Sequence, residues 1–195
     1  VCLRDHEVTM EYHKGMMKNY LFENLRFLMQ HHLFEKITIK QICDQTGVIR
    51  ATFYNYFDDK YDCLNAIVYH DFVENSHAYL EADQFPEIIG QILQVVEDNR
   101  DFYRVAYSVS GQNSFEDMVR ANLAILFKEY FVRYRRPGYL EQYSNDLLSR
   151  YYAECVAFDL RTFVFRTDGT FSVKDTRQMV LDLATNSLSN FTRKN

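Results

Sequence analysis

The fold is decided by TIKQICDQTGVIRATFYNYFDDK, residues 38–60. Thr38 is a favourable N-cap for a short helix, and Gln41 stands three residues later, where a capping box needs a side chain that reaches back. Gly47 suits the left-handed conformation that ends a helix and reverses the chain. A further helix is expected over about residues 49–57. Two short helices around a tight glycine turn predict a helix-turn-helix.

Helices are expected on both sides of this segment. Apolar residues recur every three or four positions over about residues 15–32, which is typical of an amphipathic helix. Asp58 and Asp59 suit the positive N-terminal end of another helix, whose apolar face includes Leu64 and Phe72. The pattern therefore predicts a small three-helix unit, followed by a helix that leads into the rest of the chain.

The remainder of the chain also has helical periodicity. The 195 residues include only two prolines and six glycines, which is few for a sheet protein with many tight turns. Apolar patterns indicate helices from about Pro86 to a break near Ser110, and over about residues 115–136, 141–166 and 173–191. The last two are expected to form an antiparallel pair. We predict an all-α protein.

The charge is unevenly distributed along the chain. A net charge of -5 argues against a strongly basic nucleic-acid binder. However, residues 1–60 contain eight Lys or Arg and eight Asp or Glu, whereas residues 61–195 contain fourteen and nineteen. The acidic excess lies entirely in the later part, so a neutral first part remains compatible with DNA contact.

The cysteines and the apolar runs indicate the compartment. Cys2, Cys43, Cys63 and Cys155 form no C-x-x-C pair, so neither a zinc knuckle nor a disulfide framework is expected. No run of about 18 apolar residues and no signal-peptide pattern is present. We expect a soluble, cytoplasmic protein with reduced thiols and no membrane partner. Residues 1–14 are expected to be a leading segment with little fixed structure.

Residues 38–60 closely resemble the DNA-binding signature of the TetR/AcrR family of transcriptional regulators. The resemblance combines the turn glycine, Gly47, the Thr-Phe-Tyr-x-x-Phe pattern of residues 52–57, and Lys60, three residues after that phenylalanine. With the preceding amphipathic helix it covers about residues 15–72. Any one of these elements alone would be a weak signal, whereas their joint spacing is specific.

The expected recognition helix offers side chains suited to base edges. Phe53 and Phe57, four residues apart, are expected to anchor the helix in the core. Arg50 can donate two hydrogen bonds to guanine, and Asn55 can pair with adenine. Small side chains beside them can touch thymine methyl groups. The expected outward-facing set is Arg50, Ala51, Thr52, Asn55 and Tyr56.

Other polar residues of the segment suit phosphates, which position a protein without reading sequence. The resemblance implies this role for Thr38, Tyr54 and Lys60, and Tyr56 suits it as well. Taken singly, the tyrosines are better explained by aromatic packing, and Lys60 by a solvated charge at a helix start, and only their joint spacing favours DNA contact. The family usually has a small polar N-cap where Ile49 stands, so the first turn of the helix is expected to be capped differently. The predicted DNA-binding set is Thr38, Lys40, Arg50, Ala51, Thr52, Tyr54, Asn55, Tyr56 and Lys60.

The resemblance further implies two domains. Residues 15–60 would form a three-helix helix-turn-helix DNA-binding domain, and residues 61–195 a helical dimerisation and effector-binding domain. In this family the last two helices of each subunit form a four-helix dimer bundle. An intrachain core would explain the same apolar stripe. The predicted dimer-interface residues are Leu148, Tyr152, Cys155, Val180, Leu183, Ala184 and Leu188.

An effector pocket is expected between the middle helices of the second domain. The 16% aromatic content would suit a small apolar or aromatic effector. Ordinary core packing explains the same aromatic residues. The predicted lining residues are Phe102, Tyr103, Tyr107, Phe115, Phe127, Tyr130 and Tyr152.

Two further clusters have simpler explanations. His70, Glu74 and His77 would share a helical face, but one helix rarely completes a coordination shell, so we expect no metal. Arg133, Arg135 and Arg136 come directly before Pro137. This arrangement indicates cations that interact with the carbonyl groups at the end of a helix. A phosphate-binding patch is the alternative.

Enzyme motifs are absent from the sequence. It contains no G-x-S-x-G, H-E-x-x-H, P-loop or G-x-G-x-x-G arrangement, so we expect no catalytic residues and no cofactor. The expected function is a homodimeric repressor that binds palindromic double-stranded operator DNA and is released by a small-molecule effector. The alternatives are a ligand-independent transcriptional co-activator and a protein-interaction helical bundle. A filled body without a pocket would favour the co-activator.

Overall fold

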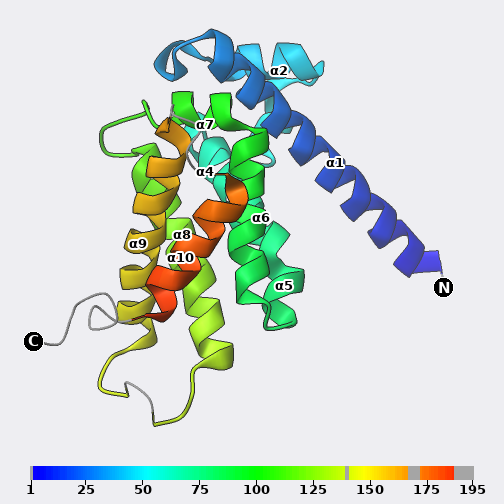
Figure 1. The fold of residues 1–195 in the computed structure, drawn as a ribbon. Helices are drawn as coiled ribbons and strands as arrows, with labels where there is room; N and C mark the ends of the chain where they lie inside the picture. The colour runs from blue at the N-terminus through cyan, green and yellow to red at the C-terminus, as the bar shows by residue number, and fades with distance from the viewer. Residues whose placement is uncertain (1, 139–140, 167–171, 187–195) are drawn as a thin grey trace, which may run out of the picture. The chain divides into compact units, whose positions relative to one another are not determined.

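Every element in the described part of the chain is a helix or a 3-10 turn, as predicted (Figure 1). The computed structural model describes residues 2–138, 141–166 and 172–186. Its elements are α1 (Cys2–His31), η1 (Phe34–Lys36), α2 (Ile39–Thr46), α3 (Arg50–Tyr54), α4 (Lys60–Phe72), η2 (Glu74–Ser76), α5 (His77–Glu81), α6 (Phe85–Asp98), α7 (Arg100–Ala106), α8 (Phe115–Tyr134), α9 (Asn145–Phe165) and α10 (Val173–Thr185). In these residues no helix is long and apolar enough to cross a membrane.

The chain divides into two compact units, Val1–Ile67 and Val68–Asn195, which we call the head and the body. The boundary lies within α4, whereas the sequence placed it directly after Lys60. α4 therefore begins in the head and ends in the body.

The first helix is longer than expected. α1 begins at Cys2, so the prediction of little fixed structure for residues 1–14 is wrong for the described residues 2–14. Neither glycine nor proline occurs there, so nothing in the local backbone interrupts a helix. The amphipathic part is confirmed, because Leu21, Leu25 and Leu28 are all buried.

Serine caps set the start of three body helices. The side chains of Ser114, Ser144 and Ser172 accept hydrogen bonds from backbone N–H groups in the first turns of α8, α9 and α10. Because Ser144 is the cap, α9 begins at Asn145 and the predicted start at residue 141 is wrong. The predicted end of the last helix, residues 187–191, lies outside the described residues.

The run predicted after Pro86 is two helices rather than one. α6 ends at Asp98, and the Asn99 side chain donates to the Val95 carbonyl at 2.9 Å, which satisfies one of the last helical acceptors. α7 then begins at Arg100. The short α5 and η2 were not predicted, because their few residues carry too little periodic signal.

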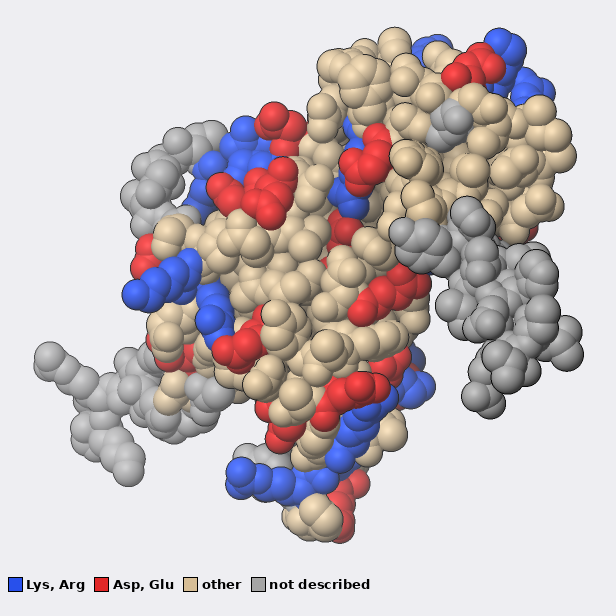
Figure 2. All heavy atoms as spheres, turned by 90° about the vertical axis from the view of Figure 1, so that its right-hand side faces the viewer, with Lys and Arg blue, Asp and Glu red and all other residues tan. Residues whose placement is uncertain are grey.

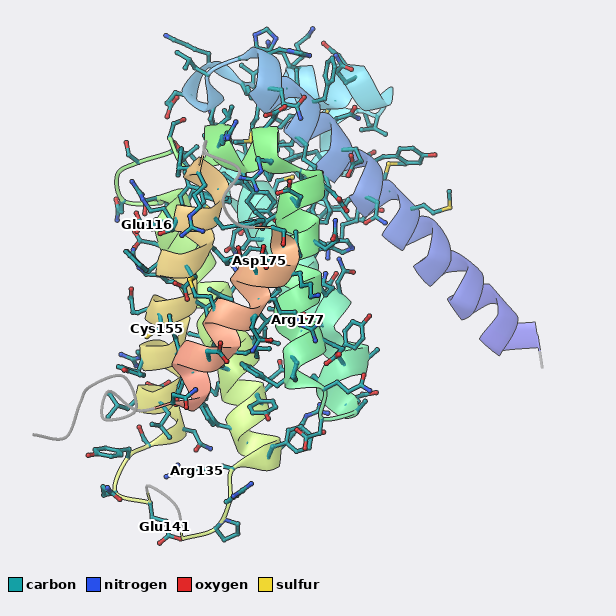
Figure 3. The ribbon with its side chains drawn as sticks, in the orientation of Figure 1. Glu116, Arg135, Glu141, Cys155, Asp175 and Arg177 are labelled. Carbon is teal, nitrogen blue, oxygen red and sulfur yellow. The ribbon has the colours of Figure 1, made fainter. Side chains whose placement is uncertain are left out.

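The longer body helices lie side by side. α8 packs most extensively on α9, and α10 packs against both α6 and α9. α9 and α10 run in opposite directions in Figure 1, as predicted, but each has a closer partner elsewhere in the body. Arg177 of α10 is bound to α6 (Figure 3), where its guanidinium group donates to the Pro86 carbonyl at 2.8 Å and to Glu87 at 3.0 Å.

A buried polar network joins the end of α4 to α6 and α7. The Tyr103 hydroxyl donates to Asp71 Oδ2 at 2.5 Å, and both residues are almost completely buried. Gln91 Nε2 donates to the Asp71 carbonyl at 3.1 Å and Gln91 Oε1 accepts from Ser76 at 3.1 Å. Buried polar groups of this kind are costly unless they are paired, so the network specifies how these elements pack.

We expect Tyr103→Phe to destabilise the body by about 1–3 kcal/mol, because a buried carboxylate loses a hydrogen-bond donor. The measurement is urea denaturation followed by circular dichroism. Tyr143→Phe is the matched control, since Tyr143 is 43% exposed and should lose little. Equal stability of the two variants would contradict a stabilising role for this network.

Candidate nucleic-acid interface

The capping box predicted at the start of α2 is present. The Thr38 side chain accepts from the Gln41 backbone N–H at 3.3 Å, and the Gln41 side chain accepts from the Thr38 backbone N–H at 2.9 Å. Two donors that the first helical turn cannot pair internally are thus satisfied. Thr38 has this structural role, and its phosphate contact remains a proposal.

Gly47 ends α2 in the predicted left-handed conformation, with φ 68° and ψ 18°. The Cys43 carbonyl accepts from the backbone N–H of Gly47 and, at 3.2 Å, from that of Val48. A side chain at this φ would be strained, so glycine is the residue best suited to the turn. The turn between the two short helices is therefore formed as the sequence predicted.

Two phenylalanines anchor α3, as expected. Phe53 is fully buried, Phe57 is almost fully buried, and their ring centroids lie 5.5 Å apart. Phe57 also packs on Phe22 of α1, with ring centroids 5.8 Å apart. α3 is shorter than predicted and ends at Tyr54, although the N–H groups of residues 55–57 continue the turn with bonds to the Thr52 and Phe53 carbonyls.

The exposed surface of α3 carries most of the predicted base-reading residues. Arg50, Ala51 and Asn55 are exposed, and Tyr54 is 55% exposed. Arg50 and Tyr54 are four residues apart, as are Ala51 and Asn55, so they form adjacent pairs on the surface. Thr52 and Tyr56, also predicted to face outward, are only partly exposed.

Ile49 belongs to the same surface and was not predicted to contact DNA. It is 71% exposed at the start of α3 and provides no side-chain cap. The signal in the sequence was an apolar residue at a position where the family usually has a small polar cap. A large exposed apolar side chain beside Arg50 suits a thymine methyl group or a sugar.

Lys40 is available for a phosphate. Its ammonium group pairs with Asp44 at 2.8 Å, and both side chains are well exposed. Exposed ion pairs of this type contribute little to stability, so Lys40 can exchange Asp44 for another anion at small cost.

Lys60 has a structural role in the head, and its predicted phosphate contact remains a proposal. Its ammonium group donates to the carbonyls of Phe34 at 2.7 Å, Glu35 at 3.0 Å and Ile37 at 2.9 Å, which uses all three N–H donors. The group also lies 4.8 Å from the centre of the Phe34 ring. Burial lowers the pKa of Lys60, while Glu35 and Asp59 oppose that change. In the head, Lys60 joins the start of α4 to the connection between α1 and α2.

Asp59 caps α4, in agreement with the acidic helix start that was predicted. Its carboxylate accepts from the backbone N–H groups of Tyr61 at 2.7 Å and Asp62 at 2.8 Å. The Asp62 carboxylate accepts in turn from the Asp58 N–H at 3.0 Å. These contacts fix the chain directly after α3.

Two sequence families match the chain. Residues 26–67 match bacterial regulatory proteins of the tetR family, and residues 83–158 match a transcriptional regulator C-terminal region. The first match spans the capping box, the glycine turn and α3. The chain belongs to the TetR family of transcriptional regulators.

Solved structures have the same fold as this TetR-family chain. The dihydroxyacetone kinase operon activator DhaS is 20% identical, with a TM-score of 0.59 over 85% of this chain and 92% of its own. A TetR-family transcriptional regulator from Syntrophomonas wolfei is 19% identical, with a TM-score of 0.61 over 90% and 98%. Thermus thermophilus FadR, a TetR-family repressor in complex with lauroyl-CoA, is 18% identical, with a TM-score of 0.59 over 91% and 97%. No curated protein sequence matches the chain.

The aromatic residues predicted to line an effector pocket fall into two groups. In the first, Phe102, Tyr103 and Phe115 are buried and their ring centroids lie 5.2–6.4 Å apart. Tyr107 packs on Phe115 with ring centroids 5.1 Å apart, and burial, with a smaller contribution from Glu116, raises its pKa. These rings fill the core around one another, so the structure does not support them as pocket-lining residues.

The second group lies where α8 meets α9. Phe127 is buried and packs on Tyr152, with ring centroids 5.8 Å apart. Tyr130 and Tyr152 line an open cavity of about 310 Å³, to which Phe131 also belongs. Of the predicted pocket residues, Tyr130 and Tyr152 do line a cavity. Its other lining residues were not predicted to line a pocket.

The predicted dimer-interface residues also lie in more than one place. Tyr152, Cys155, Val180, Leu183 and Ala184 line a groove of about 660 Å³ between α9 and α10. Leu148 lies at the other cavity, beside Tyr130, and Leu188 lies outside the described residues. Four large apolar side chains on α9 that the sequence analysis did not single out are exposed, and these are Leu147, Tyr151, Phe158 and Phe165.

The histidine cluster does not form one helical face. α4 ends at Phe72, so Glu74 and His77 belong to the following turn and to α5 rather than to the helix of His70. His77 lies 3.7 Å from Glu129, and His70 lies 3.4 Å from Asp71. Among the described residues, no group of His, Cys, Asp and Glu could hold a metal ion.

We expect Lys60→Met to destabilise the protein by about 2–4 kcal/mol, because three carbonyl groups lose a charged donor. Lys40→Met is the matched control and should cost less than about 1 kcal/mol, since its ion pair is exposed. Urea denaturation of both variants measures the difference. Unchanged stability of Lys60→Met, together with weaker DNA binding, would instead restore the phosphate role.

Proposed function

We propose that this TetR-family chain is a homodimeric repressor that binds palindromic operator DNA through α3. The observation that carries the proposal is the surface of α3, where Arg50, Ala51, Tyr54 and Asn55 are exposed while Phe53 holds the helix in the core. A short anchored helix with a bidentate donor and an amide is suited to the major groove.

Specific and nonspecific contacts are assigned to different side chains. Arg50 and Asn55 would read base edges, with Ala51 and Ile49 against thymine methyl groups. Tyr54 and Lys40 would contact phosphates, which carry no sequence information. Tyr56, Thr52 and Thr38 would contribute at the edge of this surface.

Exposed apolar side chains on α9 support the homodimer. Leu147, Tyr151, Phe158 and Phe165 are 46–70% exposed at spacings of four and seven residues, so they follow one side of the helix. Leu183 of α10 is 54% exposed and lines the groove between α9 and α10. An apolar stripe beside an open groove is suited to a second copy of the same helices, because a twofold axis pairs each surface with itself.

Repression with effector release is the proposed regulation. The repressor FadR, with its bound lauroyl-CoA, has the same fold and illustrates a small ligand in this architecture. An effector would act by favouring a dimer in which the two α3 helices no longer match the spacing of the half-sites. A co-activator is the second candidate, favoured by the filled centre of the body around Phe102, Tyr103 and Phe115.

We expect selection from a random duplex library to enrich a palindrome, and Arg50→Ala to weaken binding to it about tenfold or more. The physical reason is the loss of a bidentate contact to guanine. Fluorescence anisotropy at two salt concentrations measures the affinity. Lys40→Ala should instead weaken binding to all sequences and reduce the salt slope by about one.

The matched control is Arg133→Ala, since Arg133 is an exposed arginine at the end of α8 in the body. It should leave operator affinity unchanged. Failure of the folded wild-type dimer to enrich any sequence at low salt would reject the DNA-binding proposal.

We expect Tyr151→Asp with Phe158→Asp to produce monomers, raising the dissociation constant of the dimer at least about thirtyfold through two buried charges at an apolar interface. Sedimentation velocity measures the mass. Val132→Asp is the control, because Val132 is 67% exposed on α8, outside the α9 stripe, and should leave the dimer intact. A double variant that stays dimeric would place the interface elsewhere.

A further inference from the structure

The cavity at the joined ends of α8 and α9 has a composition that the proposed function does not use. Its volume is about 310 Å³. Four aromatic rings line it, from Tyr130, Phe131, Tyr134 and Tyr152, together with Leu148. The remaining lining residues are Arg135 and Arg136. No acidic side chain is among the lining residues that the structure describes.

The rings are held in place from outside the cavity. The Tyr130 hydroxyl donates to Asp83 at 3.2 Å, and the Tyr134 hydroxyl donates to the Leu80 carbonyl at 2.8 Å. Asp83 has a φ of 53°, in the left-handed region that Asp and Asn adopt more readily than most residues other than glycine. Because both hydroxyls are used in this way, the two tyrosines offer the cavity mainly ring surface.

Ring contacts make the wall continuous. The centroids of Tyr130 and Tyr134 lie 5.3 Å apart, and those of Phe131 and Tyr152 lie 5.6 Å apart. These separations are within the range of favourable aromatic pairs. The rings of these two pairs are tilted by 44° and 49°, so a planar ligand could stack on the face of one ring that is already in place and meet the edges of its neighbours, at little cost in conformational entropy.

The arginines supply positive charge at the edge of this wall. Arg135 ends α8, and its guanidinium group donates to Asn145 Oδ1 at 2.6 Å, which orients it at the start of α9. Arg136 is exposed. Figure 3 shows Arg135 where α8 ends, with Glu141 in the loop that leads to α9, and Figure 2 shows both Lys or Arg and Asp or Glu side chains at this end of the body. Guanidinium groups bind carboxylates through paired hydrogen bonds.

Neighbouring acidic groups already have partners of their own. Asp146 pairs with Arg150 and, at 3.5 Å, with Lys128. Glu141 accepts a hydrogen bond from the Gly138 backbone N–H at 2.7 Å. The carbonyl groups at the end of α8 disfavour an anion, but the two lining arginines outweigh their partial charge.

We propose that this cavity binds a planar aromatic carboxylate, whose ring stacks on the aromatic wall and whose carboxylate pairs with Arg135 and Arg136. The volume lies at the lower end of the range for ligand pockets, about 300–1,000 Å³, so it suits one or two rings rather than a long acyl chain. The inference rests on the proposed effector-sensing role of the body and names the chemical class of the effector.

The test is binding of 4-fluorobenzoate to the full chain, followed by ¹⁹F NMR. We expect saturable binding, with the neutral isostere 4-fluorobenzamide at least about tenfold weaker, because it cannot form the charge-assisted pair. Arg136→Gln should weaken 4-fluorobenzoate binding about tenfold, whereas Arg133→Gln, outside the cavity, should not. Tyr152→Leu should also weaken binding, whereas Tyr143→Leu, exposed and outside the lining, should not.

Absence of saturable 4-fluorobenzoate binding would overturn the inference, as would equal losses in Arg136→Gln and Arg133→Gln. Operator affinity is also measured with and without saturating 4-fluorobenzoate. This measurement distinguishes a failure of the ligand proposal from a failure of the proposed DNA-binding function. DNA binding without ligand binding would reject only the aromatic carboxylate. Ligand binding that leaves operator affinity unchanged would reject the effector role, and ligand binding without any DNA binding would reject the proposed function.

Discussion

The ammonium group of Lys60 is the contact on which the structure of the head depends. Three carbonyl oxygens from the connection between α1 and α2 converge on it, at 2.7–3.0 Å. Oxygens that point at one place repel one another unless a cation lies between them, and their partial burial makes an unpaired state costly. Because α4 begins at Lys60, this one side chain ties that helix to the chain preceding α2.

In the helix that would read DNA, the residues that anchor it in the core differ from those that face outward. Phe53 and Phe57 are buried, and Asp59 caps the next helix, so the chain is fixed on both sides of the exposed face. The core does not depend in the same way on Arg50, Tyr54 and Asn55. These side chains are therefore free to be selected for contact with DNA. The positions that define the fold and those that would define the operator are thus largely different.

Aromatic residues have three distinct environments in the body. Phe102, Tyr103 and Phe115 fill the core, whereas Phe158 on α9 is 70% exposed. Tyr130, together with the rings near it, borders an open cavity. Aromatic residues in the core, at the surface and at a cavity all recur at the same helical spacing in the sequence. For this reason the sequence predicted a single set of aromatic residues for one pocket. Only the packing of α8 against α9 and of α7 against its neighbours separates the three.

The sequence by itself determined the helical class, the capping box at Thr38, the glycine turn and the anchoring pair of phenylalanines. Each of these depends on residues within about one helical turn, so spacing and residue type are sufficient. Only the tertiary structure showed the carbonyl contacts of Lys60, because its partners lie 23 to 26 residues away in sequence. The same reason holds for the cavity beside Arg135 and the exposed stripe of α9. A cavity or an exposed surface is a property of how distant segments pack, and local periodicity carries no information about which partner covers a given face.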